Sequence, residues 1–255
     1  MNDIRWKIGI LTVLVLFCSC SKDDVEIENS NGTKLISIDY SYEENEWSEY
    51  YYYNSKDQLV EMEDLRSLGR RYEFLYSDDK VEQIETYRIS DNRIVFRDSI
   101  AYNDAGEIDR IYSYSINLGD DLPLNLIYEF EYDDAGNIVK KTTYSDFYGE
   151  NPRIQKYYWT DGNVTRAEEW SGDQLVTEYF YTYDDKIYYK KDARNYATGE
   201  VIKNRNNVKS ISFKDYSGLV DAICNPCESS YTYNLDDYPV KITTSYGRTM
   251  RINYE

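Results

Sequence analysis

A short motif that ends in an aromatic residue and a tight turn recurs along most of this chain. Its clearest copy, Tyr128 to Lys140, reads YEFEYDDAGNIVK, and a close copy runs from Ile100 to Ile111. Such spacing indicates a repeat architecture. The aromatic residue before each turn falls at Tyr53, Tyr76, Tyr102, Tyr132, Trp159, Tyr183 and Tyr233. The steps are 23 to 30 residues, except for a last step of 50, where we expect a degenerate copy around 211–215.

Each copy of the motif predicts a β-hairpin. In the clearest copy, apolar or aromatic residues at 126, 128, 130 and 132 form one face of a period-two pattern, and Glu129 and Glu131 lie on the other. This alternation is typical of a strand with one buried face. Asp133 suits the first position of a type I turn, and Gly136 can adopt the positive φ that such a turn often needs. Ile138 then begins the returning strand.

Residues 34–255 are therefore expected to form one all-β domain, an antiparallel meander of hairpin repeats with about 14 to 18 strands and little helix. A flat sheet of so many strands would curl, so we expect a twisted or rolled sheet. We predict strand rather than helix for 57–68. Residues 216–223 fit a short helical turn and an irregular loop equally well.

The repeat resembles a known unit. The stretch from Tyr132 to Ile138 (YDDAGNI) is similar to the YD repeat of Rhs and teneurin-type shells. The stretch from Tyr231 to Ile242 resembles the last repeat of YD-like lipoproteins of unknown function from Bacteroidetes. The resemblance implies a fold and a lineage. It does not imply a shell, because the chain has too few repeats to close one and carries no toxin cargo.

The first 19 residues read as a lipoprotein signal peptide. Arg5 and Lys7 precede a ten-residue apolar run, Ile8 to Phe17, which is half the length of a membrane-spanning helix. The stretch LFCSC, residues 16–20, resembles a lipobox, although Phe17 stands where Leu is usual. We therefore expect a lipid on Cys20 and membrane contact through that lipid. The alternative is a plain secretory signal that leaves Cys20 as an ordinary thiol.

Residues 20–33 are expected to form an acidic, flexible tether, because they are almost free of apolar side chains. The stretch from Ser21 to Glu26 (SKDDVE) resembles the segment that carries lipoproteins of Bacteroidetes to the outer face of the outer membrane. The predicted location is thus the outer membrane, at the cell surface rather than the periplasmic face.

The charge of the chain excludes one class of partner. Its net charge is −18, and removal of Asp3, Arg5 and Lys7 with the signal peptide changes it to −19. Such a surface repels phosphate backbones, so we expect no nucleic acid partner. The segment 186–209 is basic, and either contacts an acidic glycan or, as we favour, is a solvated hairpin whose lysines protect a sheet edge.

Two cysteines remain in the mature chain, Cys224 and Cys227. A structural zinc site needs about four ligands, and the chain has no histidine and no second cysteine pair. A redox pair would need a strand–helix context. We expect either a local disulfide or two inert thiols.

No cofactor, metal or catalytic residue is predicted. The absence of histidine excludes Ser-His-Asp and Cys-His catalysis, and no glycine-rich phosphate loop occurs. Paired acids are expected at turns, where turn chemistry explains them better than a calcium site or a glycosidase pair does. These pairs are Asp78 with Asp79, Asp133 with Asp134, Asp184 with Asp185, and Asp236 with Asp237.

The 30 tyrosines allow a structural and a functional interpretation. Tyrosine suits strands and can bury its ring while its hydroxyl stays solvated. Runs of aromatic residues, however, must place rings on both faces of a sheet, and an exposed set could stack on sugars. The candidate platform consists of Tyr51, Tyr53, Tyr157, Trp159 and Tyr188.

The expected function is a non-catalytic binding or structural role in the cell envelope, with a glycan or an envelope protein as the partner. A carboxylate-based glycan-degrading enzyme is the alternative. A third hypothesis is an assembly element whose edge strands pair with another protein.

Overall fold

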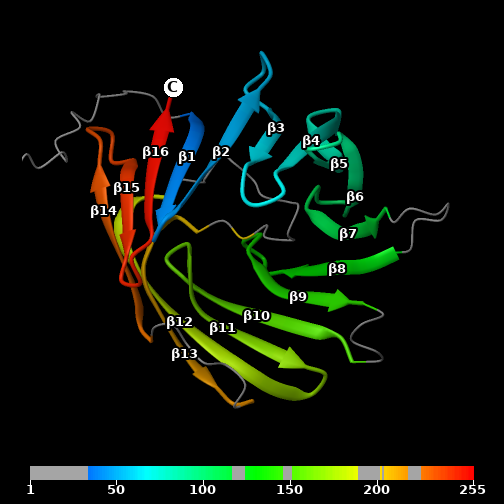
Figure 1. Ribbon diagram of the computed structural model, residues 1–255. Coiled ribbons are helices and arrows are strands. Elements are labelled where there is room, and N and C mark those ends of the chain that lie inside the picture. Colours follow the sequence, from blue (N-terminus) through cyan, green and yellow to red (C-terminus); the bar gives the residue numbers. More distant parts are fainter. Residues whose placement is uncertain (1–33, 117–123, 146–150, 189–201, 203, 218–224) are drawn as a thin grey trace, which may run out of the picture.

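The computed structural model describes residues 34–116, 124–145, 151–188, 202, 204–217 and 225–255, and these form sixteen antiparallel strands (Figure 1). The predictions for residues 1–33 lie outside this range. The strands are β1 (Leu35–Tyr42), β2 (Asn45–Tyr53), β3 (Leu59–Asp64), β4 (Arg70–Ser77), β5 (Lys80–Arg88), β6 (Arg93–Tyr102), β7 (Ile108–Ser115), β8 (Leu124–Tyr132), β9 (Ile138–Tyr144), β10 (Arg153–Thr160), β11 (Asn163–Ser171), β12 (Gln174–Ile187), β13 (Asn206–Asp215), β14 (Cys227–Tyr233), β15 (Pro239–Thr244) and β16 (Thr249–Tyr254). The described residues contain no helix, and so none that could span a membrane.

The sheet closes into a barrel. Each strand pairs with its neighbours in sequence, and β1 pairs with β16. Asn253 Nδ2 donates a 2.8 Å hydrogen bond to Ser37 Oγ across this junction, and the backbones of Lys34 and Glu255 exchange two hydrogen bonds. The all-β antiparallel prediction is confirmed, and the sheet, for which we expected only twisting or rolling, is instead a closed barrel. Closure leaves no free edge among the described strands, which removes the physical basis for edge-strand assembly. Most of the basic segment 186–209 lies outside the described residues.

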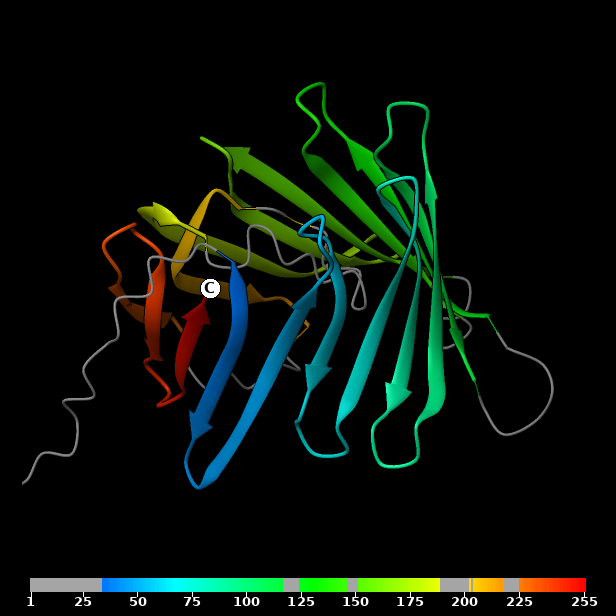
Figure 2. The ribbon, with the colours of Figure 1, turned by 90° about the horizontal axis from the view of Figure 1, so that it is seen from above.

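The hairpin turns alternate between the two ends of the barrel (Figure 2). One end carries Lys34, Glu255 and the turns that follow β2, β4, β6, β8, β10 and β14, and we call it the termini end. The other end carries the turns that follow β1, β3, β5, β11 and β15, and we call it the far end.

A five-residue turn explains the motif at the termini end. The N–H of Asp133 donates to the carbonyl of Asn137 at 2.9 Å, and the N–H of Gly136 donates to the carbonyl of Asp133 at 3.0 Å. Asp133 Oδ1 accepts the N–H groups of Ala135 and Asn137. The same backbone pattern begins at Asn54, Asn103 and Asn234. Its fourth residue has a positive φ, which is 59° at Asp57, 83° at Gly106, 78° at Gly136 and 64° at Asp237.

The predicted turn role of the paired acids is confirmed at Asp133 and in the turns after β4 and β14. It is wrong for Asp184 and Asp185, which lie within β12. The strand β12 does not turn after Tyr183 but continues to Ile187, so the two acids lie near its end.

The repeated aromatic residues mark irregularities in the wall. A register shift falls immediately before each of the seven predicted positions. A bulge of this kind re-aims one side chain and bends the strand. In most units the aromatic side chain then donates a hydrogen bond to the backbone carbonyl of the preceding strand. These bonds join Tyr76 to Leu59 (2.9 Å), Tyr102 to Val81 (2.8 Å), Tyr132 to Ile108 (2.8 Å), Trp159 to Ile138 (2.8 Å) and Tyr183 to Val164 (2.6 Å).

The last units depart from the predicted positions. Tyr231, two residues before Tyr233, donates to the carbonyl of Val208, and Tyr254 on the closing strand donates to Pro239 at 3.0 Å. The expected degenerate copy around 211–215 is wrong, because β13 is simply the return strand of β12. The extra residues of the 50-residue step lie in the connections on either side of β13. The strand prediction for 57–68 is confirmed by β3. Most of 216–223 lies outside the described residues.

The apolar face of the wall points into the barrel. Three isoleucines of the wall have no exposed surface, namely Ile38, Ile84 and Ile111. A single curved sheet can bury side chains so completely only on its concave side, where neighbouring side chains converge. Tyr233 on β14 also donates to Asp184 on β12, across β13, which requires the shorter distances of the concave side. Full burial of one such side chain stabilises the fold by roughly 1.5–3 kcal/mol.

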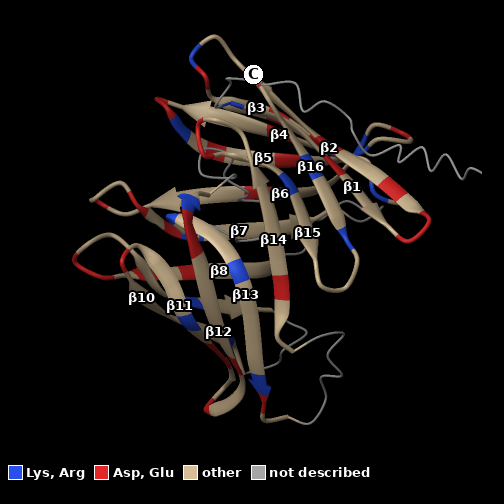
Figure 3. Cartoon of the chain, turned by 90° about the vertical axis from the view of Figure 1, so that its left-hand side faces the viewer, with Lys and Arg blue, Asp and Glu red and all other residues tan. Residues whose placement is uncertain are grey.

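The outer face carries charge ladders and exposed aromatic rings. Glu85 lies opposite Arg97, and their closest atoms are 2.7 Å apart. Further cross-strand pairs join Arg110 to Glu129 (3.0 Å) and Lys140 to Glu131 (2.7 Å). Figure 3 shows charged residues of both signs spread over strands and turns.

Candidate functional site

The predicted aromatic platform does not form an outer surface. Tyr51 and Tyr157 are buried, at 5% and 8% exposure, and Tyr51 donates a 2.6 Å hydrogen bond to Glu49. Trp159 is half-buried, and its indole N–H donates a hydrogen bond to the carbonyl of Ile138. The ammonium of Lys34 lies over the ring of Tyr53. Strand alternation places these rings on the concave side, where they belong to the core.

Tyr188, the remaining member of the predicted platform, is half-buried just beyond β12, and its backbone N–H donates to Arg205 at 3.2 Å. Neighbours of the predicted residues are exposed instead, namely Tyr50 (36%), Tyr52 (43%) and Tyr158 (41%), and Tyr144 (41%) and Tyr216 (50%) are exposed elsewhere. The alternation in the sequence shows that aromatic rings lie on both faces of the sheet, but it does not show which face is concave.

The outer face brings two carboxylates together, but not as an acid–base pair. Glu168 on β11 lies opposite Glu178 on β12, and Nη2 of Arg166 donates to both at 2.5 Å. Hydrogen bonds from Tyr216 and from Arg166 hold the pKa of Glu178 below its ordinary value. A glycosidase needs one carboxyl that stays protonated. The lowered pKa of Glu178 favours its ionised form, and the guanidinium of Arg166 links both carboxylates, so we interpret this cluster as a structural ion network.

Another carboxyl, that of Asp98, lies apart from this cluster, inside the barrel. Asp98 on β6 is 3% exposed and lies between Ile84 and Ser113 on the adjacent strands. Burial raises its pKa to about 6, and the hydrogen bond from Ser113 opposes that rise. Its Oδ1 has no hydrogen-bond partner among the described residues.

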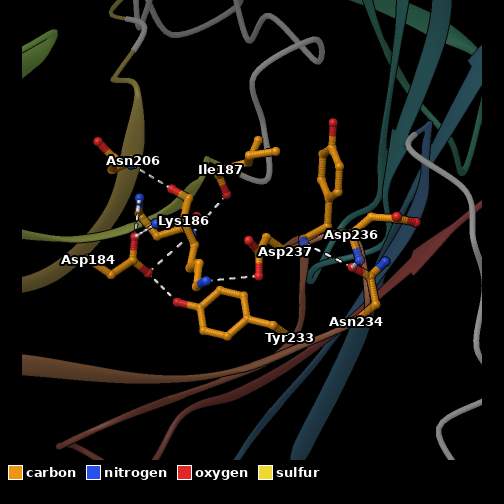
Figure 4. A network of polar contacts seen from close by, with 10 residues as sticks. Asp184, Lys186, Ile187, Asn206, Tyr233, Asn234, Asp236 and Asp237 are labelled. Atoms are coloured by element: carbon orange, nitrogen blue, oxygen red, sulfur yellow. Dashed lines mark hydrogen bonds and ion pairs between the residues drawn. The ribbon is translucent and has the colours of Figure 1, made fainter.

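Polar contacts at the termini end connect β12, β13 and β14 (Figure 4). Asp184 accepts hydrogen bonds from the N–H of Lys186, from the N–H and side chain of Asn207, and from the hydroxyl of Tyr233. Lys186 Nζ lies 2.9 Å from Asp237 in the turn after β14. Burial and the hydrogen bond to Asp184 raise the pKa of Tyr233. Because its members satisfy one another, this network is a structural link between strands.

A groove of about 710 Å³ crosses β12, β13, β14 and β15 on the outer face. Its floor is built from short hydroxyl side chains, and Lys209 and Glu228 add one charge of each sign. The hydroxyl residues on the outer side of the groove are Thr182, Ser210, Ser230 and Thr243, with Ser245 in the turn after β15. Ser229, Thr244 and Tyr183 complete the lining, and Ser229 and Thr244 pair on the concave side of the wall.

Register brings the groove's hydroxyls together. Thr182 lies opposite Ser210 with 2.6 Å between their hydroxyl oxygens, and Ser230 lies opposite Thr243. The strands β13 and β14 pair through only two residue pairs among the described residues, Ser210 with Glu228 and Ile211 with Cys227. The groove therefore lies over the least extensively paired junction in the described wall. The sequence analysis missed it, because serines and threonines spread over sixty residues carry no local pattern.

The cysteine prediction is partly testable. Cys227, at the start of β14, is disulfide-bonded, whereas its expected partner Cys224 lies outside the described residues. No group of three or more potential metal-ligating residues occurs within the described ranges.

Comparison with known proteins shows a shared fold. No protein-family profile matches the chain, and no curated protein matches it in sequence. Among solved structures, a porin-like protein from Bacteroides uniformis matches 88% of this chain and 98% of its own, with a TM-score of 0.58 and 11% identity. A porin-like protein from Bacteroides vulgatus matches 87% and 98%, with a TM-score of 0.55 and 12% identity. A TcdB2–TccC3–Cdc42 structure matches 84% of this chain and 14% of its own at a TM-score of 0.35 and 10% identity, which is too low to show a shared fold. At these identities, the first two matches show that the barrel architecture recurs in Bacteroides proteins.

Proposed function

We propose that this chain is a non-catalytic binding protein of the cell envelope, anchored by a lipid on Cys20, and that a glycan binds in the hydroxyl-lined groove. The groove carries the proposal. Each hydroxyl can donate and accept a hydrogen bond, which matches a polyhydroxylated ligand. A volume of about 710 Å³ lies within the usual range of ligand sites. The nearly balanced charge of its lining favours a neutral sugar.

The outer face supports lipid anchoring over insertion of the barrel. A transmembrane barrel presents an apolar band about 25 Å tall to the lipid. Here the outer face carries ion pairs such as Arg97 with Glu85 and Arg110 with Glu129. We therefore assign membrane contact to the lipid on Cys20, and the outer membrane, at the cell surface, as the location.

The turn geometry supports the proposed lineage. The five-residue turn begins with Asp or Asn and places Gly or Asp at a positive φ, and the preceding aromatic residue sits at a bulge. These are the positions that carry the resemblance to YD-like lipoproteins of Bacteroidetes. We propose that the barrel is a small, closed form built from such units.

The test is a glycan-array screen of a chain lacking residues 1–20. This chain retains every strand, because the barrel closes between Leu35 and Tyr254. Ser230→Trp fills the groove, and Thr232→Trp adds the same ring to the same face of the same strand, outside the groove. We expect binding to neutral glycans that Ser230→Trp abolishes and Thr232→Trp preserves.

Two results would count against the proposal. Silence on the array would remove the glycan, and equal loss in both tryptophan variants would remove the groove as the site. Release of shortened glycans on prolonged incubation would instead favour the enzyme alternative.

A further inference from the structure

Three arginines lie side by side at the far end of the barrel, on the concave face. Arg70 on β4 is opposite Arg88 on β5, and Arg88 is opposite Arg93 on β6. Like charges directly opposite one another destabilise a sheet. In a chain with a net charge of −18 this arrangement is unexpected, because acids are plentiful and could have occupied any of these positions.

The local acids do not neutralise the row. Arg88 donates to Asp91 at 3.0 Å, whereas Arg70 and Arg93 have no carboxylate within ion-pair distance among the described residues. The guanidinium of Arg70 instead lies over the ring of Phe96, 5.3 Å from its centre, in a cation–π contact. The row therefore presents positive charge that an external anion can satisfy.

The arginines line a pocket of about 350 Å³. The rest of its lining is mainly apolar and consists of Leu68, Val95, Phe96 and Ile116, with Gly69 and Ser115 between them. Leu68 is 70% exposed and forms an apolar lip. A pocket with cations at one side and apolar walls matches a ligand that has both features.

The pocket wall is preformed. Gly69 has a φ of +60°. Its backbone carbonyl accepts a 3.2 Å hydrogen bond from the N–H of Ile89, in the turn after β5. A Cβ added at Gly69 would lie 3.2 Å from Cδ1 of Ile89. The loop after β3 thus packs tightly against the turn after β5 and holds the pocket open without a ligand.

We infer that this pocket binds a small amphiphilic anion, with a carboxylate or phosphate head on the arginines and an apolar chain against Leu68 and Phe96. The site is separate from the hydroxyl groove, which lies on the outer face of β12–β15. It adds a second ligand class to the proposed function and does not depend on it.

The test is calorimetric titration of the chain lacking residues 1–20 with octyl phosphate and with octanoate, both as monomers. Inorganic phosphate tests the head alone, and octyl glucoside tests the tail alone. We expect both amphiphiles to bind at least about tenfold more tightly than either control, because charge-assisted hydrogen bonds and apolar burial contribute together. Arg70→Gln and Arg93→Gln should each weaken binding about tenfold or more. Arg251→Gln, on the exposed outer face of β16, should not.

Equal affinity for inorganic phosphate and octyl phosphate would overturn the amphiphilic ligand. Unchanged affinity in Arg93→Gln, an exposed position whose loss leaves the core intact, would overturn the site. Vesicles of phosphatidylcholine with phosphatidylglycerol separate a lipid headgroup from a free ligand. Binding to these vesicles without binding to soluble octyl phosphate would also contradict the proposal. Retention of amphiphile binding in Ser230→Trp would separate this site from the groove.

Discussion

The hydroxyl of Tyr132 donates a 2.8 Å hydrogen bond to the backbone carbonyl of Ile108, on the preceding strand. The relationship recurs around the barrel, from Tyr76 on β4 to Tyr254 on β16. The accepting residue lies opposite the preceding repeated aromatic residue, as Ile108 lies opposite Tyr102 at the bulge of the β6–β7 hairpin. The aromatic hydroxyl or indole thus satisfies a carbonyl at the bulge of the preceding hairpin.

Tyr132→Phe should therefore destabilise the protein by about 1–2 kcal/mol, because it leaves the Ile108 carbonyl without its partner and preserves the ring. Urea denaturation followed by tyrosine and tryptophan fluorescence measures the change. Tyr50→Phe, an exposed outer-face tyrosine, is the matched control and should shift the free energy of unfolding by less than about 0.5 kcal/mol. Equal effects of the two substitutions would contradict a special role for the repeated hydrogen bond.

The buried carboxyl of Asp98 predicts a pH-dependent stability. Its pKa is about 6 in the folded protein, against about 3.9 in an unfolded chain. The folded state therefore binds the proton more tightly, and stability should fall as pH rises from about 4 to about 6, by roughly 3 kcal/mol in total from this group. Asp98→Asn should remove this contribution.

The measurement for Asp98 is urea denaturation of both proteins at pH 4 and pH 8. Asp98→Asn should be clearly more stable than the unsubstituted protein at pH 8 and close to it at pH 4. Other carboxyls, such as Glu85, have a lowered pKa and act in the opposite direction, so the difference between the two proteins is the relevant quantity. A difference that does not change with pH would rule out the buried charge.

The fourth turn position should discriminate side chains by their tolerance of positive φ. Gly136 has a φ of +78°, and the equivalent residues Asp57 and Asp237 adopt +59° and +64°. Gly136→Asn should cost less than about 1 kcal/mol, whereas Gly136→Val should cost about 2 kcal/mol, because a β-branched side chain clashes there. Thermal melts of the two variants provide the comparison. The reverse order would show that the turn can change its conformation.

Anchoring through Cys20 predicts a change in cell fractionation. Cys20→Ala should move the folded protein from the membrane fraction to the soluble fraction, because we propose that the lipid, and not the charged outer face, holds it at the membrane. Cys18→Ala alters the neighbouring cysteine, which we expect to be removed with the signal peptide, so this variant should stay with the membrane. Membrane retention of Cys20→Ala would contradict the anchor or the repulsive surface.

The local part of the fold could be predicted from the sequence. The alternation before Asp133 gave the strand, and the Asp–Gly spacing gave the turn, because both depend on residues within a few positions of one another. The aromatic residues at the seven predicted positions each lie opposite a bulge in the returning strand, which explains why they stand out from the surrounding pattern.

Closure and the sites could not be predicted in this way. Ser37 and Asn253, which join the first and last strands, are 216 positions apart, and no local pattern encodes their pairing. Alternation separates two faces but does not say which is concave, and so Tyr51 could equally have been exposed. The arginine pocket likewise depends on the register of three strands, which brings Arg70, Arg88 and Arg93 into one row.

The reciprocal backbone bonds between Lys34 and Glu255 place the first and last strands' outer ends at the same end of the barrel. If a lipid on Cys20 anchors the protein as we propose, the membrane attachment joins the barrel at this end. The pocket around Arg70 lies at the opposite end, so anchoring would leave it directed away from the membrane.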